Sequence, residues 1–175
     1  MEESRSNQSS QQNIVISLRD VVSSDLPIFF EQQLDPEANR MAAFTSKDPT
    51  DRDAFMAHWN RNLGNKQNII QTIIFENQVA GSVSSYIDEE LGEPEVTYWL
   101  GKSYWGKGIA TKALSAFLLH NTVRPIYARA AKDNFASLRV LEKCGFIPIG
   151  EGKGFANARG EEIEEFILKL DIVQP

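Results

Sequence analysis

EVTYWLGKSYWGKGIATKALSAF, residues 95–117, is the stretch of this sequence that decides the fold. It begins with strand-forming residues, breaks at Gly101, Gly106 and Gly108, and continues as a helix from Ile109. One face of this helix is apolar, with residues at helical spacing: Ala110, Ala113, Leu114 and Phe117. Glycines let backbone approach a ligand closely, and the first-turn N–H groups of a helix have no partners inside it. A strand, a glycine-rich turn and a helix start therefore predict a phosphate-binding site.

The bulk composition favours one domain in a reducing compartment. A length of 175 residues fits a single domain, and 42% hydrophobic residues supply an ample core. The formal net charge of −6 argues against a nucleic-acid partner, which usually requires a basic face. The single cysteine, Cys144, cannot form an intramolecular disulfide, and no apolar run approaches the roughly 18 residues of a membrane span. We therefore expect a cytoplasmic protein, monomeric or homodimeric, with no nucleic-acid or membrane partner.

The remaining patterns predict one mixed α/β (α+β) layer structure. Residues 1–12 are polar without an apolar anchor and predict a disordered tail, so the folded domain is expected over residues 13–172. The predicted strands cover residues 14–18, 67–75, 78–87, 96–100, 126–131, 146–149 and 163–170. The predicted helices cover residues 26–34, 52–63, 109–117 and 134–144. Residues 35–48 predict a short, partly helical connection, and Glu76-Asn77 predicts a tight hairpin turn.

Two familiar phosphate-binding templates fit the glycine turn poorly. A Walker loop requires Ser or Thr after its GK pair to hold magnesium, and the sequence has Gly108 there. A dinucleotide-binding GxGxxG turn requires a third glycine, and the sequence has Thr111 at that position. The chain also lacks the repeated βαβ pattern that precedes a dinucleotide site. A nucleotide-binding protein is therefore the least favoured interpretation.

A third template fits both the glycine turn and a segment downstream. YWGKGIATKAL resembles the acyl-CoA pyrophosphate loop of the GNAT superfamily of N-acetyltransferases, whose pattern is Gln/Arg-x-x-Gly-x-Gly/Ala. Gly106 and Gly108 occupy the small positions, and Ser103 replaces the Gln/Arg. NFASLRVLEKCGF, from residue 134, is similar to the Asn-x-x-Ser…Glu-Lys-x-Gly-Phe segment of the ribosomal-protein-alanine acetyltransferase-like branch. Both motifs occur in the family's order, so the resemblance is specific over residues 95–146.

The resemblance implies the GNAT fold and its chemistry. The fold is a single domain with a mostly antiparallel, twisted sheet of about seven strands, flanked by about four helices. Strands four and five splay apart in this family. The implied co-substrate is acetyl-CoA, with no metal, and the implied acceptor is a primary amine of a protein N-terminus or of a small molecule. The rival interpretation is a non-catalytic acyl-CoA-binding module.

The resemblance also implies which residues bind the co-substrate. The strand end would pair its backbone with the pantetheine amides through Trp99, Leu100 and Gly101. The loop and first helical turn would hold the diphosphate through main-chain N–H groups of Trp105, Gly106, Lys107, Gly108, Ile109, Ala110 and Thr111. Asn134 would face the pantetheine arm. An alternative for Asn134 is an ordinary helix cap, and the two roles are compatible.

Two residues are candidates for catalysis. Ser137 lies one turn after Asn134 and could donate a hydrogen bond to the departing thiolate; the alternative is a first-turn serine bonded to backbone. An amine must lose a proton before it attacks a thioester, so a general base is useful. Glu95 is the candidate base, acting directly or through a water. Its alternative role is simply to end the acidic turn that starts at Asp88.

Other polar residues predict no chemistry. His58 and His120 are far apart in sequence and, with a lone cysteine, form no metal-ligand spacing. The glycine-rich run 150–154 predicts a flexible connection between the last two strands that could cover the acceptor as a lid. The nearby acidic residues predict a solvated edge: Glu161, Glu162, Glu164 and Glu165.

Overall fold

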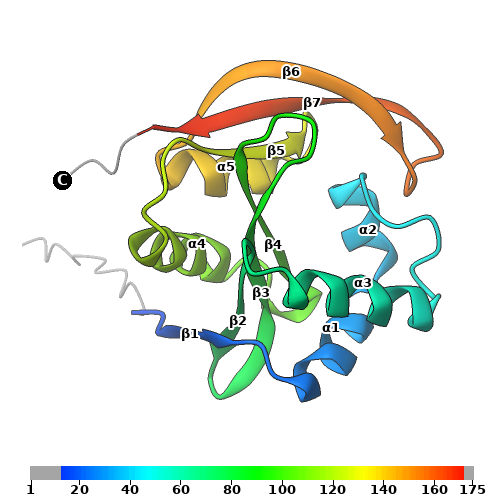
Figure 1. The fold of residues 1–175 in the computed structure, drawn as a ribbon, viewed down its shortest axis with the longest axis vertical. Coiled ribbons are helices and arrows are strands. Elements are labelled where there is room, and N and C mark those ends of the chain that lie inside the picture. The colour runs from blue at the N-terminus through cyan, green and yellow to red at the C-terminus, as the bar shows by residue number, and fades with distance from the viewer. Residues whose placement is uncertain (1–12, 172–175) are drawn as a thin grey trace, which may run out of the picture.

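A seven-stranded sheet in the order β1-β2-β3-β4-β5-β7-β6 forms the centre of the computed structural model (Figure 1). The structure describes residues 13–171, so the predicted tail at 1–12 and residue 172 lie outside the described residues. The strands are β1 (Ile16–Asp20), β2 (Ile69–Phe75), β3 (Gln78–Ile87), β4 (Pro94–Leu100), β5 (Ile126–Ala131), β6 (Ile147–Ala156) and β7 (Glu161–Leu170). The helices are α1 (Leu26–Gln33), α2 (Pro36–Ala42), α3 (Arg52–Gly64), α4 (Ile109–His120) and α5 (Phe135–Lys143). Short 3-10 turns occupy Ser23–Asp25 and Lys102–Tyr104.

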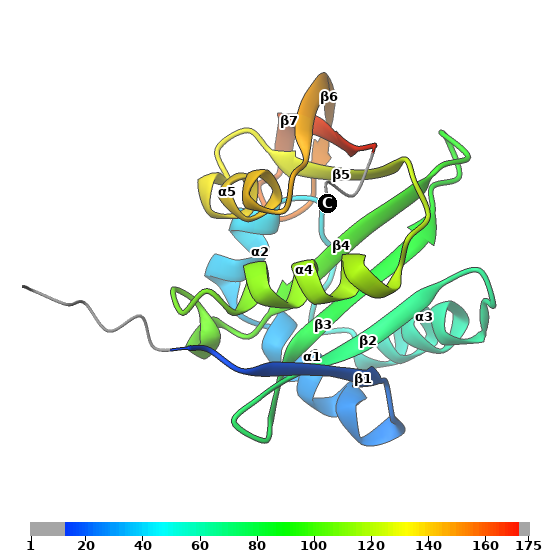
Figure 2. The same cartoon turned by 90° about the vertical axis from the view of Figure 1, so that its left-hand side faces the viewer.

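The helices lie on both sides of the sheet, as the mixed α/β prediction requires. Helices α4 and α5 cover one side and α1, α2 and α3 the other (Figures 1 and 2). The described residues contain five α-helices where about four were predicted. The additional one is α2, because the Asp35 side chain accepts a 2.8 Å hydrogen bond from the Ala38 N–H and Pro36 fits the first turn.

The sheet is antiparallel except at one junction. Strands β4 and β5 run parallel and share a single register pair, Glu95 with Tyr127. Beyond that pair the two strands diverge, which confirms the predicted splay. The β2–β3 hairpin turns at Glu76 and Asn77, as the sequence predicted, and their φ angles of 50° and 62° are those of a primed two-residue turn.

Helix α4 supplies much of the core. Its predicted apolar face is buried at Ala113, Leu114 and Phe117, and Ile109 at its start is also buried. These side chains pack against β-strand residues in one hydrophobic cluster. Full burial of a Leu or Phe side chain stabilises a fold by roughly 1.5–3 kcal/mol, so this face fixes α4 against the sheet. The start of α4 is thereby held beside the end of β4.

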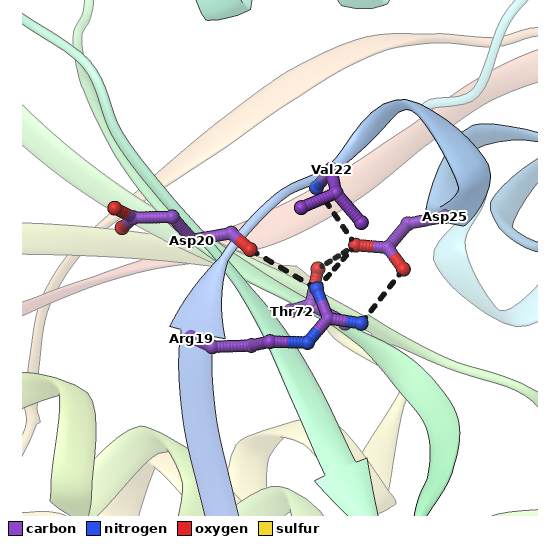
Figure 3. A network of polar contacts seen from close by, with 5 residues as sticks. All are labelled: Arg19, Asp20, Val22, Asp25 and Thr72. Carbon is purple, nitrogen blue, oxygen red and sulfur yellow. Dashed lines mark hydrogen bonds and ion pairs between the residues drawn. The ribbon is translucent and has the colours of Figure 1, made fainter.

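A buried ion pair fixes the corner between β1 and α1. Asp25 is 1% exposed and accepts hydrogen bonds from both guanidinium NH groups of Arg19 and from the Val22 N–H and the Thr72 hydroxyl (Figure 3). Burial by itself raises the pKa of Asp25, but these donors, with Arg19 first, outweigh it and lower that pKa to about 2. The network ties β1, the start of α1 and β2 together.

The prediction of a flexible connection at residues 150–154 is wrong, because these residues belong to β6 and pair with β7. At two of the three glycines in this run, a side chain from another element lies over the strand. A Cβ at Gly152 would come within 3.1 Å of the Glu165 carboxylate, and one at Gly154 within 3.3 Å of the Phe44 ring. The prediction of a solvated edge is also wrong for Glu165, which is buried. The actual connection between the strands is the short turn from residue 157 to 160.

Candidate functional site

A cleft of about 930 Å³ lies where β4 and β5 diverge. Its walls come from the end of α2, β4, the glycine turn, the first turn of α4, β5, α5 and the β6–β7 pair. Most of the predicted site residues line it: Glu95, Trp99, Leu100, Trp105, Gly106, Gly108, Ile109, Ala110, Thr111, Asn134 and Ser137. The fold therefore brings two segments that are well separated in sequence to one cavity.

Gly101 and Lys107 lie outside the lining of this cleft. The N–H of Gly101 donates to the Ala80 carbonyl at 2.9 Å, and the Gln32 side chain lies 3.0 Å from the position that a Cβ on Gly101 would take. The Lys107 ammonium lies 5.8 Å from the centre of the Phe75 ring. The side chain of Lys107 is therefore directed toward the β2–β3 end of the sheet.

The glycine turn positions the start of α4 toward the cleft. Gly106 and Gly108 have φ angles of 72° and 77°, which favour glycine, and Gly108 is the N-cap of α4. The first helical hydrogen bond runs from the Lys112 N–H to the Gly108 carbonyl, so the preceding N–H groups have no acceptor inside the helix. These groups and the helix dipole favour an anion such as a diphosphate.

Helix α5 adds positive charge near this end. Arg139 and Lys143 are one turn apart on α5 and both line the cleft. The neighbouring Cys144 thiol lies 3.7 Å from the Thr111 carbonyl in the first turn of α4. One end of the cleft thus combines unpaired backbone donors with two cationic side chains.

The edge of β4 on the side of β5 has further polar groups without hydrogen-bond partners. Because β4 and β5 share only the Glu95–Tyr127 pair, the backbone of β4 beyond Glu95 has no strand partner on that side. The Trp99 indole Nε1 is buried without a hydrogen-bond partner and belongs to a residue that lines the cleft. The Leu100 carbonyl accepts a 3.1 Å hydrogen bond from the Trp105 indole. A ligand with amide groups, such as a pantetheine arm, fits an edge of this kind.

The middle of the cleft carries a hydroxyl pair. The Tyr98 hydroxyl donates to Ser137 Oγ at 3.0 Å. Asn134 accepts from the Ser137 N–H at 3.2 Å, so it is the helix cap that the sequence allowed. Its amide group also donates to the Met41 carbonyl at 3.2 Å. Asn134 therefore joins α5 to the end of α2 across the cleft.

The opposite end of the cleft is acidic. Glu95 is 5% exposed, and its Oε2 lies 3.4 Å from Arg129 Nε. Arg129 also lies 3.3 Å from Glu165 and 3.9 Å from Asp88. Burial, followed by the neighbouring charges of Asp88 and Glu165, raises the pKa of Glu95, whereas Arg129 and the Tyr86 hydroxyl oppose the rise. A carboxyl whose pKa lies above its usual value suits proton transfer near neutral pH.

The turn between β6 and β7 holds the end of α2 against the cleft. Arg159 pairs with the Asp133 carboxylate and donates from Nε to the Arg40 carbonyl at 2.8 Å. Asn157 donates to the Thr45 carbonyl at 2.7 Å. The segment held in this way contributes Met41 and Phe44 to the lining.

Sequence reasoning assigned no role to several residues of this site, among them Tyr98, Arg129, Glu165 and Asp88. One signal was available for Arg129. It is the single charged residue in the short strand IYARAA, and a charged side chain in a buried strand usually has a partner. Pairing between Tyr98 and Ser137 depends on tertiary contact between β4 and α5 and has no local signal.

Neither histidine lies in the cleft. His58 is exposed on α3 and contacts Asn62, and His120 ends α4. Residues 13–171 contain no group of three or more His, Cys, Asp or Glu side chains placed to hold a metal ion. Within the same range, no helix has the length and apolar character needed to cross a membrane.

Comparison with known proteins agrees with this geometry. The acetyltransferase (GNAT) domain model matches residues 16–147. The uncharacterized N-acetyltransferase p20 of Bacillus licheniformis is 25% identical over 164 residues, covering 89% of this chain and 92% of that protein. The ribosomal L7/L12 alpha-N-protein acetyltransferase RimL, solved in complex with coenzyme A, superimposes with a TM-score of 0.77 at 22% identity, over 90% of this chain and 94% of that one.

A second solved structure has the same fold. The microcin C7 self-immunity acetyltransferase MccE, in complex with acetyl-CoA and AMP, gives a TM-score of 0.75 at 19% identity and covers 93% of this chain and 94% of that chain. The family model spans three quarters of the chain, including the glycine turn and α5. This chain therefore belongs to the GNAT family of acetyltransferases, whose acetyl donor is acetyl-CoA.

Proposed function

We propose that this acetyltransferase moves the acetyl group of acetyl-CoA directly to a primary amine, on a protein N-terminus or a small molecule. The observation that carries the proposal is the arrangement of one continuous cleft. It is lined at one end by the N-terminus of α4 and at the other by the buried carboxylate of Glu95, with the Tyr98–Ser137 pair between them.

The donor would occupy the end with unpaired backbone groups. The N–H groups from Gly108 to Thr111, with Arg139 and Lys143, would bind its phosphates. The pantetheine arm would lie along the free edge of β4 beside Trp99. Asn134 would contact that arm while it caps α5. This placement directs the thioester toward Ser137.

Glu95 would act as the general base. Successive residues in a strand are about 3.3 Å apart, so Glu95 and Tyr98 are separated by roughly 10 Å along β4. Their side chains leave opposite faces of β4, so the amine would enter between them, either directly against Glu95 or through one water. The carboxylate takes a proton from the ammonium group, and the free nitrogen then attacks the thioester carbon. The new C–N bond forms as the C–S bond breaks.

Ser137 would stabilise the departing thiolate. Because Ser137 Oγ already accepts from Tyr98, its own hydroxyl proton is free to donate to sulfur. Burial raises the pKa of Tyr98, so the phenol stays protonated and keeps donating to Ser137 near neutral pH. The attacking nitrogen is cationic once the C–N bond has formed, and its second proton passes to the thiolate, which leaves as the thiol of CoA. Glu95 then returns the first proton to water.

A thiol-release assay tests the proposal directly. The purified chain is incubated with acetyl-CoA and a panel of peptides with free N-termini, lysine analogues and small amines, and the products are identified by mass spectrometry. We expect thiol release that depends on one class of amine, with acetylated nitrogen as the product. Binding of acetyl-CoA with no acetylated product from any amine would contradict the proposal.

A further inference from the structure

The acidic end of the cleft has more negative than positive charge. Asp88, Glu95 and Glu165 all face the single guanidinium of Arg129, which leaves a formal charge of −2 from three carboxylates and one cation. Their distances to Arg129 of 3.9, 3.4 and 3.3 Å all exceed the roughly 2.7–2.9 Å of a close charge-assisted hydrogen bond. The carboxylates are therefore only partly neutralised.

Two lysines, one just after β5 and one on β6, are paired with other carboxylates. Lys132 forms ion pairs of 2.9 Å with Glu151 and with Glu164. Lys153, on the rim of the cleft, lies 3.7 Å from Glu162. Within the described residues, Arg129 is thus the one basic side chain that contacts the three cleft carboxylates.

A buried acceptor atom points to a ligand at this place. Glu95 Oε2 lies 3.4 Å from Arg129 Nε, and both atoms are buried without a hydrogen-bond partner, although Glu95 lines the cleft and is 5% exposed. A carboxylate can accept several hydrogen bonds, and an unused buried acceptor is unfavourable in a folded protein. The unpaired Glu95 oxygen favours a ligand that donates hydrogen bonds, and the excess negative charge favours a cationic one.

We propose that the cleft selects amines that carry a second positive charge near the reacting nitrogen. This inference rests on the proposed function, because it names the acceptor class of the same site. The reacting ammonium gives its proton to Glu95, after which Asp88, Glu165 and Arg129 still have a formal charge of −1. A second ammonium or guanidinium on the acceptor neutralises that charge. A carboxylate in the same position is repelled.

Matched substrate pairs test the selection. 1,4-Diaminobutane is compared with butylamine, and peptides with the same first residue carry either Lys or Glu at the second position. We expect kcat/KM to be on the order of tenfold higher for the dicationic member of each pair at low salt, with a smaller ratio at high salt. The diamine pair and the peptide pair together distinguish a small-molecule acceptor from a protein N-terminus. Equal rates within every pair, or preference for the acidic peptide, would overturn the inference.

Substitutions locate the source of the preference. Glu165→Gln and Asp88→Asn each remove one negative charge. Each should lower the ratio of kcat/KM between the dicationic substrate and its partner several-fold. Glu161→Gln is the matched control, because Glu161 lies on the same strand, is exposed and does not line the cleft. A ratio unchanged in both cleft variants would refute the inference even if one of them folds poorly. Acetylation of all amines without preference would refute the selection alone, whereas no acetylation of any amine would refute the proposed function as well.

Discussion

The Tyr98 hydroxyl donates to Ser137 Oγ at 3.0 Å, so a side chain from β4 and one from α5 act as a single hydrogen-bonding unit. We expect Ser137→Ala to lower kcat about 10- to 100-fold, because the thiolate loses its donor. Tyr98→Phe keeps the ring and should lower kcat by a smaller factor. Steady-state kinetics with acetyl-CoA check both, and wild-type kcat in both variants would exclude the pair from catalysis.

The raised pKa of Glu95 predicts the pH dependence of the reaction. The carboxyl must be ionised to accept a proton, so kcat/KM should rise with pH through a pKa above the usual carboxyl range. Glu95→Gln should abolish this rise of kcat/KM with pH and lower kcat/KM by about 10²- to 10⁴-fold. A raised folded-state pKa means that the protonated carboxyl stabilises the fold and that this stability is lost as pH rises through it. The neutral Gln variant should therefore melt no lower than the wild type at pH 7.

The backbone of Gly106 gives a test of the donor site that has an internal control. Its φ is 72°, no protein atom lies within 4 Å of a Cβ built on it, and it lines the cleft. We expect Gly106→Ala to weaken CoA binding at least about tenfold, because the methyl group occupies ligand space. Gly160→Ala has the same backbone strain, with φ of 66° and no neighbour within 4 Å, but lies in the β6–β7 turn. Both variants should lose roughly 1–2 kcal/mol of stability. Equal CoA affinity in the two, measured by calorimetry, would contradict a donor site at the glycine turn.

Arg159 should affect the acceptor more than the donor. It holds the end of α2 through the Arg40 carbonyl and pairs with Asp133. In Arg159→Ala the segment that carries Met41 and Phe44 loses this support, and we expect KM for the amine to rise about 3- to 10-fold. The Kd for CoA, measured in parallel, should stay within twofold of the wild-type value. A rise in both constants would instead indicate general loosening of the fold.

Asp25 predicts how the fold responds to acid. Its folded-state pKa of about 2 lies below the usual value of 3.8, so its contribution to stability is present above about pH 4 and is lost as pH falls toward 2. The shift corresponds to roughly 2 kcal/mol. We expect Asp25→Asn to lower the free energy of unfolding at pH 7 by at least that amount, because Arg19 loses its partner. Urea titrations at pH 7 and pH 2.5 check this, and a similar loss at both pH values would contradict the role of the charge.

Local signals predicted much of this fold. The apolar face of α4, the tight hairpin at Glu76-Asn77 and the strand–turn–helix order around Gly108 each depend on a few neighbouring residues. No local pattern indicated that the glycines of β6 belong to a strand. Gly152 and Gly154 are there because Glu165 and Phe44 approach the strand, and Phe44 is more than 100 residues away in sequence.

The sequence predicted only those site residues that belong to a recognisable motif. Glu95 and Ser137 both line the cleft, as a shared site requires, although their roles remain predictions. Arg129 and Asp88 acquire their importance from one another, through contacts between β5 and the turn before β4. No sequence window contains that information, because the contact exists only after the sheet has formed.

Among the described residues, the single register pair between Glu95 and Tyr127 is the one strand pairing between two stacks of strands, β1–β4 and β5–β7. Glu95 belongs to the first stack and Arg129 to the second, 3.4 Å apart. A small rotation of one stack against the other lengthens or shortens that distance, and the proton affinity of Glu95 changes with it. In the proposed function, a donor lying along the free edge of β4 between the stacks would change that distance and, with it, the basicity of Glu95.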